Sequence, residues 1–170
     1  MNISIVIPVY NASLTLKECL DAIFNTNLKN FEVIIVSDNS TDNSVEIASQ
    51  YQCKVIELPQ NRGPGFARNI GAQEAKGDIL LFIDSDVIIN KEALNSLSDK
   101  FLNQEVNVIQ GIYSHKPIYK NAVTQYQQSF YSYYSWDPNI NFTSSLITNC
   151  FAIRRKIFIE LKGFNTNIRG

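Results

Sequence analysis

Short runs of apolar and β-branched residues alternate along the chain with segments in which apolar positions recur every three or four residues. This alternation predicts strands joined by helices. The expected strands are 3–9, 32–37, 54–58 and 78–83, and the expected helices are 13–25, 43–52 and 65–75. Strands such as VIIV and ILLFI are apolar at odd and even positions alike, as in a parallel sheet covered on both faces. The pattern predicts an α/β fold with a doubly wound, mostly parallel central sheet flanked by helices.

The first helix has the clearest pattern, because its apolar residues fall at i, i+3, i+4, i+7 and i+8. These residues are Leu16, Cys19, Leu20, Ile23 and Phe24. In the second helix Asn43 stands three residues before Glu46, which is typical of a capping signal at a helix start.

The chain changes character after residue 86. A helix is expected at 91–103 and a strand at 106–113, followed by a polar, aromatic stretch at 116–149. We expect a helix in its first half and a loop in its second half, closed by a strand at 146–153. A helix at 155–162 then ends at Gly163. The tyrosines of 126–134 fit either core or interface packing or acceptor binding, and His115 fits a loop.

Length and charge narrow the class. A chain of 170 residues with 45% hydrophobic residues is long enough for one domain with a real core. The formal net charge of -1, without any basic run, does not favour nucleic acid as a partner. The three cysteines are widely spaced, which predicts neither a disulfide framework nor a zinc site and fits a reducing cytoplasm. We expect no signal peptide and no membrane span in this chain.

Polar residues follow each of the first four expected strands. They are Tyr10-Asn11, Asp38-Asn39-Ser40, the loop at 60–63, and Asp84-Ser85-Asp86. In doubly wound sheets ligands bind outside the carboxyl ends of the strands, where such loops converge. The sequence therefore predicts a binding site at this edge.

Two carboxylates, Asp84 and Asp86, lie inside the apolar run ILLFIDSDVII. A buried, ionised carboxylate is costly unless it is paired, hydrogen-bonded or bound to a metal. In an extended segment the two side chains would point to the same side, about 6 to 7 Å apart. That spacing suits Mg²⁺ or Mn²⁺ held by oxygen ligands together with a diphosphate. Alternatively, the two aspartates are solvated in a turn that ends the strand.

Four motifs occur in order, each after an expected strand: PVYN at 8–11, SDNSTD at 37–42, NRGPGFARNIG at 61–71 and DSD at 84–86. This ordered set resembles the family 2 glycosyltransferases, which are inverting enzymes of the GT-A (Rossmann-like) fold. The segment TNCFAIRRKIFIELKGF at 148–164 is similar to the part of that family just before its catalytic base. The resemblance covers nearly the whole chain.

The resemblance implies a nucleotide-sugar site. Pro8 and Tyr10, with Val9 between them, match residues that line the nucleotide base. Asp38 matches the acid that accepts a hydrogen bond from a uracil-type base. The family has a second acid where this chain has Ser37.

The remaining matches concern the diphosphate, the ribose and the metal. Arg68 matches a basic residue near the base and diphosphate, where a guanidinium suits phosphate oxygens. Asp84, with Ser85 beside it, matches the ribose position and a second metal contact. Asp86 matches the ligand of Mn²⁺ or Mg²⁺.

The implied reaction transfers a sugar from a nucleotide-diphosphate sugar, expected to be a UDP-sugar, to an acceptor hydroxyl with inversion. The acceptor is a saccharide, a lipid carrier or a protein, and the location is the cytoplasm, including the inner face of a membrane. The family's general base follows a segment like Gly163-Phe164-Asn165, and no acid follows Glu160 here. We therefore expect the base beyond Gly170, and we do not expect Asp137 to replace it. On this view 1–170 is one C-terminally truncated catalytic domain, with 1–113 binding the nucleotide sugar and 114–170 beginning the acceptor side.

Each motif alone also fits a simpler role. Tyr10 can belong to a turn before a helix, Asp38 to an Asx turn that caps the second helix, and Arg68 to a helix surface. Gly63 and Gly65 can serve only to shape a turn. Among functions, a dinucleotide-binding oxidoreductase lacks its G-x-G-x-x-G after the first strand. A catalytically incomplete module that binds nucleotide sugars has the same donor site and stays an alternative.

Overall fold

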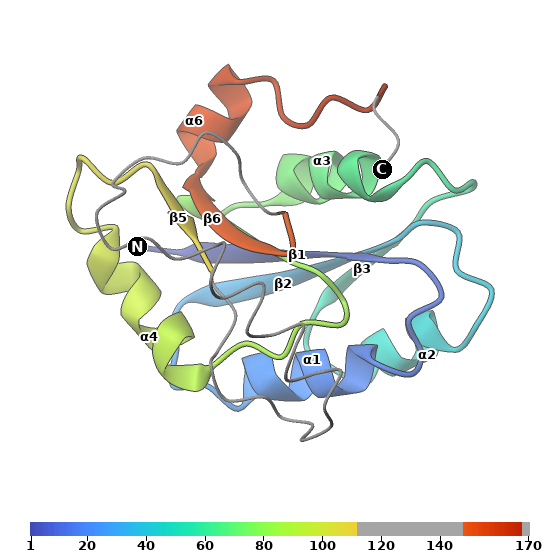
Figure 1. Ribbon diagram of the computed structural model, residues 1–170. Coiled ribbons are helices and arrows are strands. Elements are labelled where there is room, and N and C mark those ends of the chain that lie inside the picture. The colour runs from blue at the N-terminus through green and yellow to red at the C-terminus, as the bar shows by residue number, and fades with distance from the viewer. Residues whose placement is uncertain (112–147, 168–170) are drawn as a thin grey trace, which may run out of the picture.

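The computed structural model describes residues 1–111 and 148–167, and in these residues a single mixed sheet forms the centre of the molecule (Figure 1). The sheet has six strands in the order β3-β2-β1-β4-β6-β5. The strands are β1 (Ile3–Val9), β2 (Phe31–Ser37), β3 (Lys54–Glu57), β4 (Ile79–Ile83), β5 (Val108–Gln110) and β6 (Cys150–Arg154).

The first four strands along the chain are parallel to one another. β1 lies between β2 and β4, with Val9 paired to Ser37 and Val6 to Phe82. β3 adds to the far side of β2. β6 runs antiparallel to both β4 and β5. The prediction of a mostly parallel sheet is confirmed, and the carboxyl ends of β1, β2, β3 and β4 meet along one edge.

Helices cover both faces of the sheet, as Figure 1 shows. The helices are α1 (Leu16–Phe24), α2 (Ser44–Ala48), α3 (Pro64–Glu74), α4 (Lys91–Lys100) and α6 (Arg155–Glu160). One buried cluster joins α1 and α4 to alternate residues of β1, and a second joins α3 and α6 to Val6 of β1 and to residues of β2, β4 and β6. Each central strand is therefore buried on both faces, which explains why its sequence is apolar at both parities.

The predicted stripe of α1 is confirmed, since Leu16, Cys19, Leu20 and Ile23 are all buried. The capping prediction for α2 is only half right. Asn43 occupies the N-cap position, but its side chain makes no capping hydrogen bond. The carboxylate of Asp42 accepts from the Ser44 N–H instead, at 3.0 Å.

Several elements are shorter than the sequence predicts. α2 ends at Ala48, because the chain then turns to place Tyr51 against α1. The Tyr51 hydroxyl donates to Asp21 at 2.7 Å, and its ring centroid lies 5.4 Å from that of Phe24. β5 and β6 are also shorter than expected, and the predictions for 112–147 lie outside the described residues.

α3 lies unusually close to the sheet. Gly63 precedes it with a φ of +86°, and Pro64 stands at its first position, a combination that suits a helix start. A Cβ on Gly71 would lie 2.3 Å from Cγ1 of Val6. Glycine at 71 thus permits α3 to lie close to β1.

Among the residues that the structure describes, no helix combines the length and the apolar character needed to cross a membrane.

Candidate functional site

The loops at the carboxyl edge of the sheet are tied together by hydrogen bonds. The loop after β1 donates to the loop after β2 from three consecutive backbone amides. These bonds run from Asn11 N to Ser40 Oγ (3.2 Å), Ala12 N to Ser44 Oγ (2.9 Å) and Ser13 N to Asp42 Oδ2 (2.8 Å). The return bond runs from Thr41 N to Asn11 Oδ1 at 2.8 Å. These bonds join the two loops, and Asp38 N donates to Val9 O at 2.7 Å where the loops begin.

Asp42 is the central acceptor of this unit. Burial raises the pKa of its carboxyl, but hydrogen bonds from Ser44 and Ser13 outweigh burial and lower the pKa to about 2. The carboxylate therefore stays ionised. The sequence motif SDNSTD contains Asp42, yet no role was predicted for it.

Asp38 is buried, with 2% of its surface exposed, and its carboxylate shapes the loop after β3. Oδ1 accepts from Arg62 N at 2.8 Å, and Oδ2 accepts from Gly63 N at 2.7 Å. The alternative that Asp38 caps the second helix is wrong, because Asp42 bonds to the amino end of α2. The contact with a nucleotide base stays a prediction.

Asp84 begins a turn rather than continuing the strand. Its N–H donates to Asn149 O at 2.9 Å, as the last bond between the two neighbouring chain segments, and Val87 N donates to Asp84 O at 3.0 Å. The expectation that 84–86 is extended is therefore wrong, because pairing with β6 stops here and the chain turns. Asp86 is exposed, whereas 32% of the surface of the Asp84 side chain is exposed.

Arg68 compensates the partly buried carboxylate of Asp84. Its Nη2 donates to Asp84 Oδ1 in an ion pair, and the residue is only 5% exposed. The alternative that Arg68 lies on the helix surface is wrong. Burial raises the pKa of Asp84 and Asp86 raises it further, while Arg68 opposes both, and the pKa stays above its ordinary value. Removing Arg68 would therefore leave a poorly solvated carboxyl.

Divalent metal binding has to be judged from the two carboxylates of this turn. Among the described residues no group of three or more His, Cys, Asp or Glu side chains is arranged to hold a metal. The available protein donors are Asp86, which is exposed, and the part of Asp84 not paired with Arg68. One or two carboxylates complemented by ligand phosphates is an arrangement that Mg²⁺ commonly adopts. These residues fit such an ion in the presence of a phosphate ligand.

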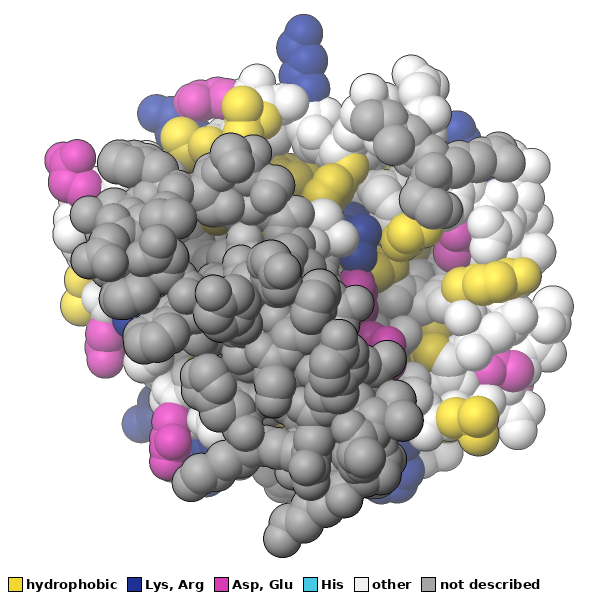
Figure 2. Space-filling model, viewed as in Figure 1, with side chains coloured by type: hydrophobic (Ala, Val, Ile, Leu, Met, Phe, Trp, Pro, Cys, Tyr) yellow, Lys and Arg dark blue, Asp and Glu magenta, His cyan; other side chains and the backbone are white. Residues whose placement is uncertain are grey.

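The other predicted residues lie where the motifs place them. Pro8 and Val9 are buried at the end of β1, and Tyr10 beyond them is 56% exposed. Ser85 lies in the turn after β4. His115, Asp137 and the tyrosines of 126–134 lie outside the described residues. Figure 2 shows acidic and basic side chains beside one another near the middle of one face of the molecule.

Two residues that lie in the quoted motifs, but for which the sequence predicts no role, also contact this region. Asn69 Nδ2 donates to Phe164 O, and Phe164 N donates to Asn69 Oδ1, both at 2.9 Å. The two residues are 95 positions apart. No local pattern signals such a pair.

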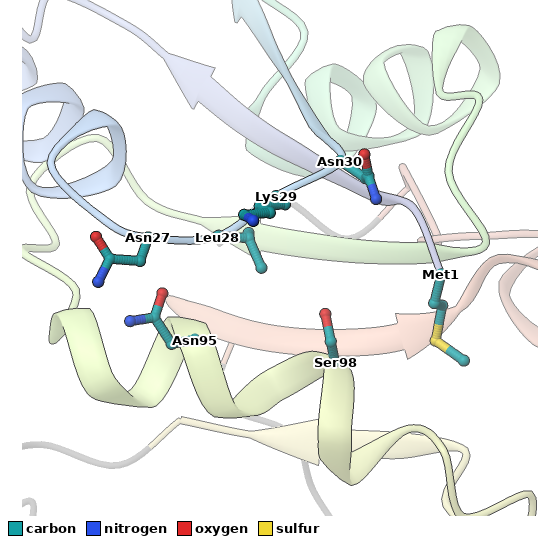
Figure 3. A pocket seen from close by; sticks show the side chains of 7 residues that line it. All are labelled: Met1, Asn27, Leu28, Lys29, Asn30, Asn95 and Ser98. Atoms are coloured by element: carbon teal, nitrogen blue, oxygen red, sulfur yellow. The ribbon is translucent and has the colours of Figure 1, made fainter.

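A pocket lies at the other edge of the sheet, near the start of β1 and β2 (Figure 3). Its lining is Met1, Asn27, Leu28, Lys29, Asn30, Asn95 and Ser98. None of these residues belongs to the motifs above, so the pocket and the motif residues lie at opposite edges of the sheet. We favour the motif edge, since the parallel strands present their loops and the Arg68–Asp84 pair there.

Comparison with known proteins links the chain to one family. The family model described as "Glycosyl transferase family 2" matches residues 4–162. Among curated proteins, the poly(ribitol-phosphate) beta-glucosyltransferase of Bacillus spizizenii is 47% identical over 102 residues. That match covers 55% of this chain and 16% of the relative, so the chain spans only a small part of that protein's length.

Solved structures share the fold. Residues 1–349 of S. aureus TarS in complex with UDP superpose with a TM-score of 0.79 at 23% identity, covering all of this chain and 52% of that one. The mannosyltransferase PcManGT from Pyrobaculum calidifontis, in complex with GDP-Man and Mn²⁺, has a TM-score of 0.78 at 19% identity. This likeness covers 98% of this chain and 48% of that chain.

Proposed function

The chain belongs to glycosyl transferase family 2 and has the GT-A fold, and from this premise we propose that it binds a nucleoside diphosphate sugar at the carboxyl edge of its sheet. It serves as the donor-binding part of an enzyme that transfers the sugar to an acceptor hydroxyl with inversion. The single observation that carries this proposal is the ion pair between the buried Arg68 and the partly buried Asp84, at the rim where four loops converge.

The base and ribose are assigned to the loops after β1, β2 and β4. The exposed ring of Tyr10 offers a flat apolar wall for a base, above the buried end of β1. Asp38 and the loop that it shapes bound the other side. We propose UDP as the nucleotide, supported by the UDP complex of TarS. Asp84 and Ser85 face the ribose.

The diphosphate is assigned to Arg68 and to a metal at Asp86. When bound, Mn²⁺ or Mg²⁺ neutralises the charge that develops on the leaving diphosphate. Manganese is present in the PcManGT complex. Arg68 holds Asp84 in one orientation, and Asp86 remains exposed and free to approach the ion with Asp84 as its second carboxylate.

The acceptor side requires a carboxylate base on the far side of the sugar. We assign this base to a segment beyond Gly170, and the acceptor to a saccharide, lipid carrier or protein. We propose the cytoplasm as the location, either away from membranes or at the inner face of one. Inversion is checked by NMR spectra of the reaction product, which give its anomeric configuration.

The test is a thermal-shift panel of UDP, GDP, CDP, dTDP and NAD, each with and without Mn²⁺. A ligand at 100 times its dissociation constant stabilises the folded state by about 2.7 kcal/mol. We expect UDP with Mn²⁺ to raise the melting temperature of the wild type and of Asp99→Ala, which removes an exposed acid on α4. Asp86→Ala should lose the metal-dependent part. A shift with NAD alone, or an equal UDP shift in Asp86→Ala, would refute the assignment.

A further inference from the structure

We infer that Asn69 and Phe164 are positioning residues that hold the guanidinium of Arg68 against Asp84. The inference rests on the proposed function in one respect, since the consequence for donor binding follows only if the site binds a donor. The arrangement of the three side chains is independent of that function. It joins the segment after α6 to the helix that carries Arg68.

The first observation is the pair of hydrogen bonds between Asn69 and Phe164. The carboxamide uses its donor and its acceptor on the carbonyl and the N–H of one residue, both at 2.9 Å. Such a bidentate contact fixes the backbone at residue 164 in both position and orientation. A side chain with only one of the two functions cannot reproduce it.

The turn before Phe164 is shaped to this contact. Gly163 has a φ of +71°, and its N–H donates to Phe158 O at 3.1 Å, closing the end of α6. A Cβ on Gly163 would lie 2.5 Å from Asn69 Oδ1. The glycine thus provides both the left-handed conformation and the space that the Asn69 side chain occupies.

The Phe164 ring completes an aromatic group under Arg68. Its centroid lies 5.4 Å from that of Phe82, 5.5 Å from Phe158 and 5.9 Å from Phe151. The Arg68 guanidinium carbon lies 5.5 Å from the Phe164 centroid, within the range of a cation–π contact.

Among the described residues, the hydrogen bond from Nη2 to Asp84 holds the guanidinium. Within the described part of the chain, Arg68 Nε is buried and has no hydrogen-bond partner. The ion pair with Asp84 therefore fixes one end of the group, and the Phe164 ring lies beside its central carbon. If the ring moves, Arg68 loses that wall and can adopt other rotamers. Asn69, which holds the ring in place, then acts on the donor site through Arg68.

The test follows the Arg68 Nε proton by ¹⁵N NMR in the ligand-free protein, with the resonance assigned by its loss in Arg68→Lys. We expect a slowly exchanging proton in the wild type, because the atom is buried. In Asn69→Ala and Phe164→Leu its exchange should be about tenfold faster, while backbone amides of α3 keep their rates. Phe164→Tyr, which keeps a ring, should retain the slow proton. Gln73→Ala, an exposed residue one turn further along α3, is the matched control.

Unchanged exchange in both Asn69→Ala and Phe164→Leu would overturn the inference, even if both variants were less stable. The consequence for the donor is measured by a double-mutant cycle on UDP affinity with Mn²⁺. Asn69→Ala should weaken binding about tenfold in the wild-type background and much less in Arg68→Lys. Equal losses in the two backgrounds would contradict action through Arg68. Absent UDP binding in the wild type would refute the proposed function but leave the Nε result to decide the positioning role.

Discussion

Arg68 and Asp84, sixteen residues apart, form a partly buried ion pair that joins the middle of α3 to the end of β4. This pair explains how a carboxylate is tolerated next to the apolar strand β4. The charge of Asp84 is paired with the guanidinium of Arg68, on the sheet side of α3. Asp86 is exposed to solvent. One of the two acids is thus held in place while the other remains free to bind.

Arg68→Met should destabilise the fold by about 2 kcal/mol, because it leaves the Asp84 carboxyl without its counter-charge. This loss of stability is expected to be smaller than that for breaking a fully buried ion pair, since Asp84 keeps some contact with solvent. Urea unfolding at pH 7 measures it. Combining Arg68→Met with Asp84→Asn should recover part of the loss. Full stability of Arg68→Met alone would show that the pair does not compensate the carboxylate.

Asp42 should make the stability depend on acid pH. Its folded pKa is about 2, below the ordinary 3.8, so the carboxylate contributes stability that is present above about pH 4 and is lost as the pH falls towards 2. Asp42→Asn should lower the free energy of unfolding by about 1 kcal/mol at pH 7, because hydrogen bonds to an ionised carboxylate are stronger than those to a neutral amide. Unfolding measured at several pH values should show this difference shrinking towards pH 2. A difference that does not change with pH would argue against the assigned cause.

Two glycines of α3 should respond in opposite directions to alanine. Gly71→Ala places a methyl group 2.3 Å from Val6 Cγ1 and should cost about 1 to 3 kcal/mol by overpacking. At Gly65 the nearest atom would be 3.6 Å away, so Gly65→Ala should be neutral or stabilise by about 0.5 kcal/mol. Thermal unfolding of the two variants provides the comparison. Similar effects at both positions would mean that the close approach of α3 to β1 is not required.

Tyr10 should bind the base through its ring rather than its hydroxyl. Tyr10→Ala should weaken UDP binding by about 1 kcal/mol, the lower end of values for base stacking on an aromatic side chain. Tyr10→Phe should bind UDP as the wild type does, because the ring stays. Calorimetric titration at fixed Mn²⁺ concentration distinguishes the cases. Equal weakening in both variants would assign the contact to the hydroxyl.

The sequence was sufficient where a local pattern decides the structure. The stripe of α1 and the double-sided apolar strands predicted their burial, and strand ends predicted which loops share an edge. The DSD segment was predicted as extended because the apolar run continues past it. Its turn depends on where pairing with β6 stops, at Asn149, and that long-range contact leaves no local signal.

For the same reason, the sequence predicted several residues of the site but not the partners that they contact. The motifs named Asp38 and Arg68, but the backbone amides of Arg62 and Gly63 that Asp38 accepts from carry no sequence signature. The burial of Arg68 depends on Gly71 bringing α3 close to the sheet. The Asn69–Phe164 contact spans 95 positions, so only the fold brings it about.

The most direct test of the central claim is to map UDP binding residue by residue. Backbone amide shifts of the ¹⁵N-labelled protein are recorded during titration with UDP and Mg²⁺. We predict the largest changes at 10–13, 38–42, 61–63 and 84–87, with none at 27–30 or at Asn95 and Ser98. Changes concentrated at the pocket of Figure 3 would contradict the account, and so would saturating UDP that leaves the carboxyl-edge loops unchanged.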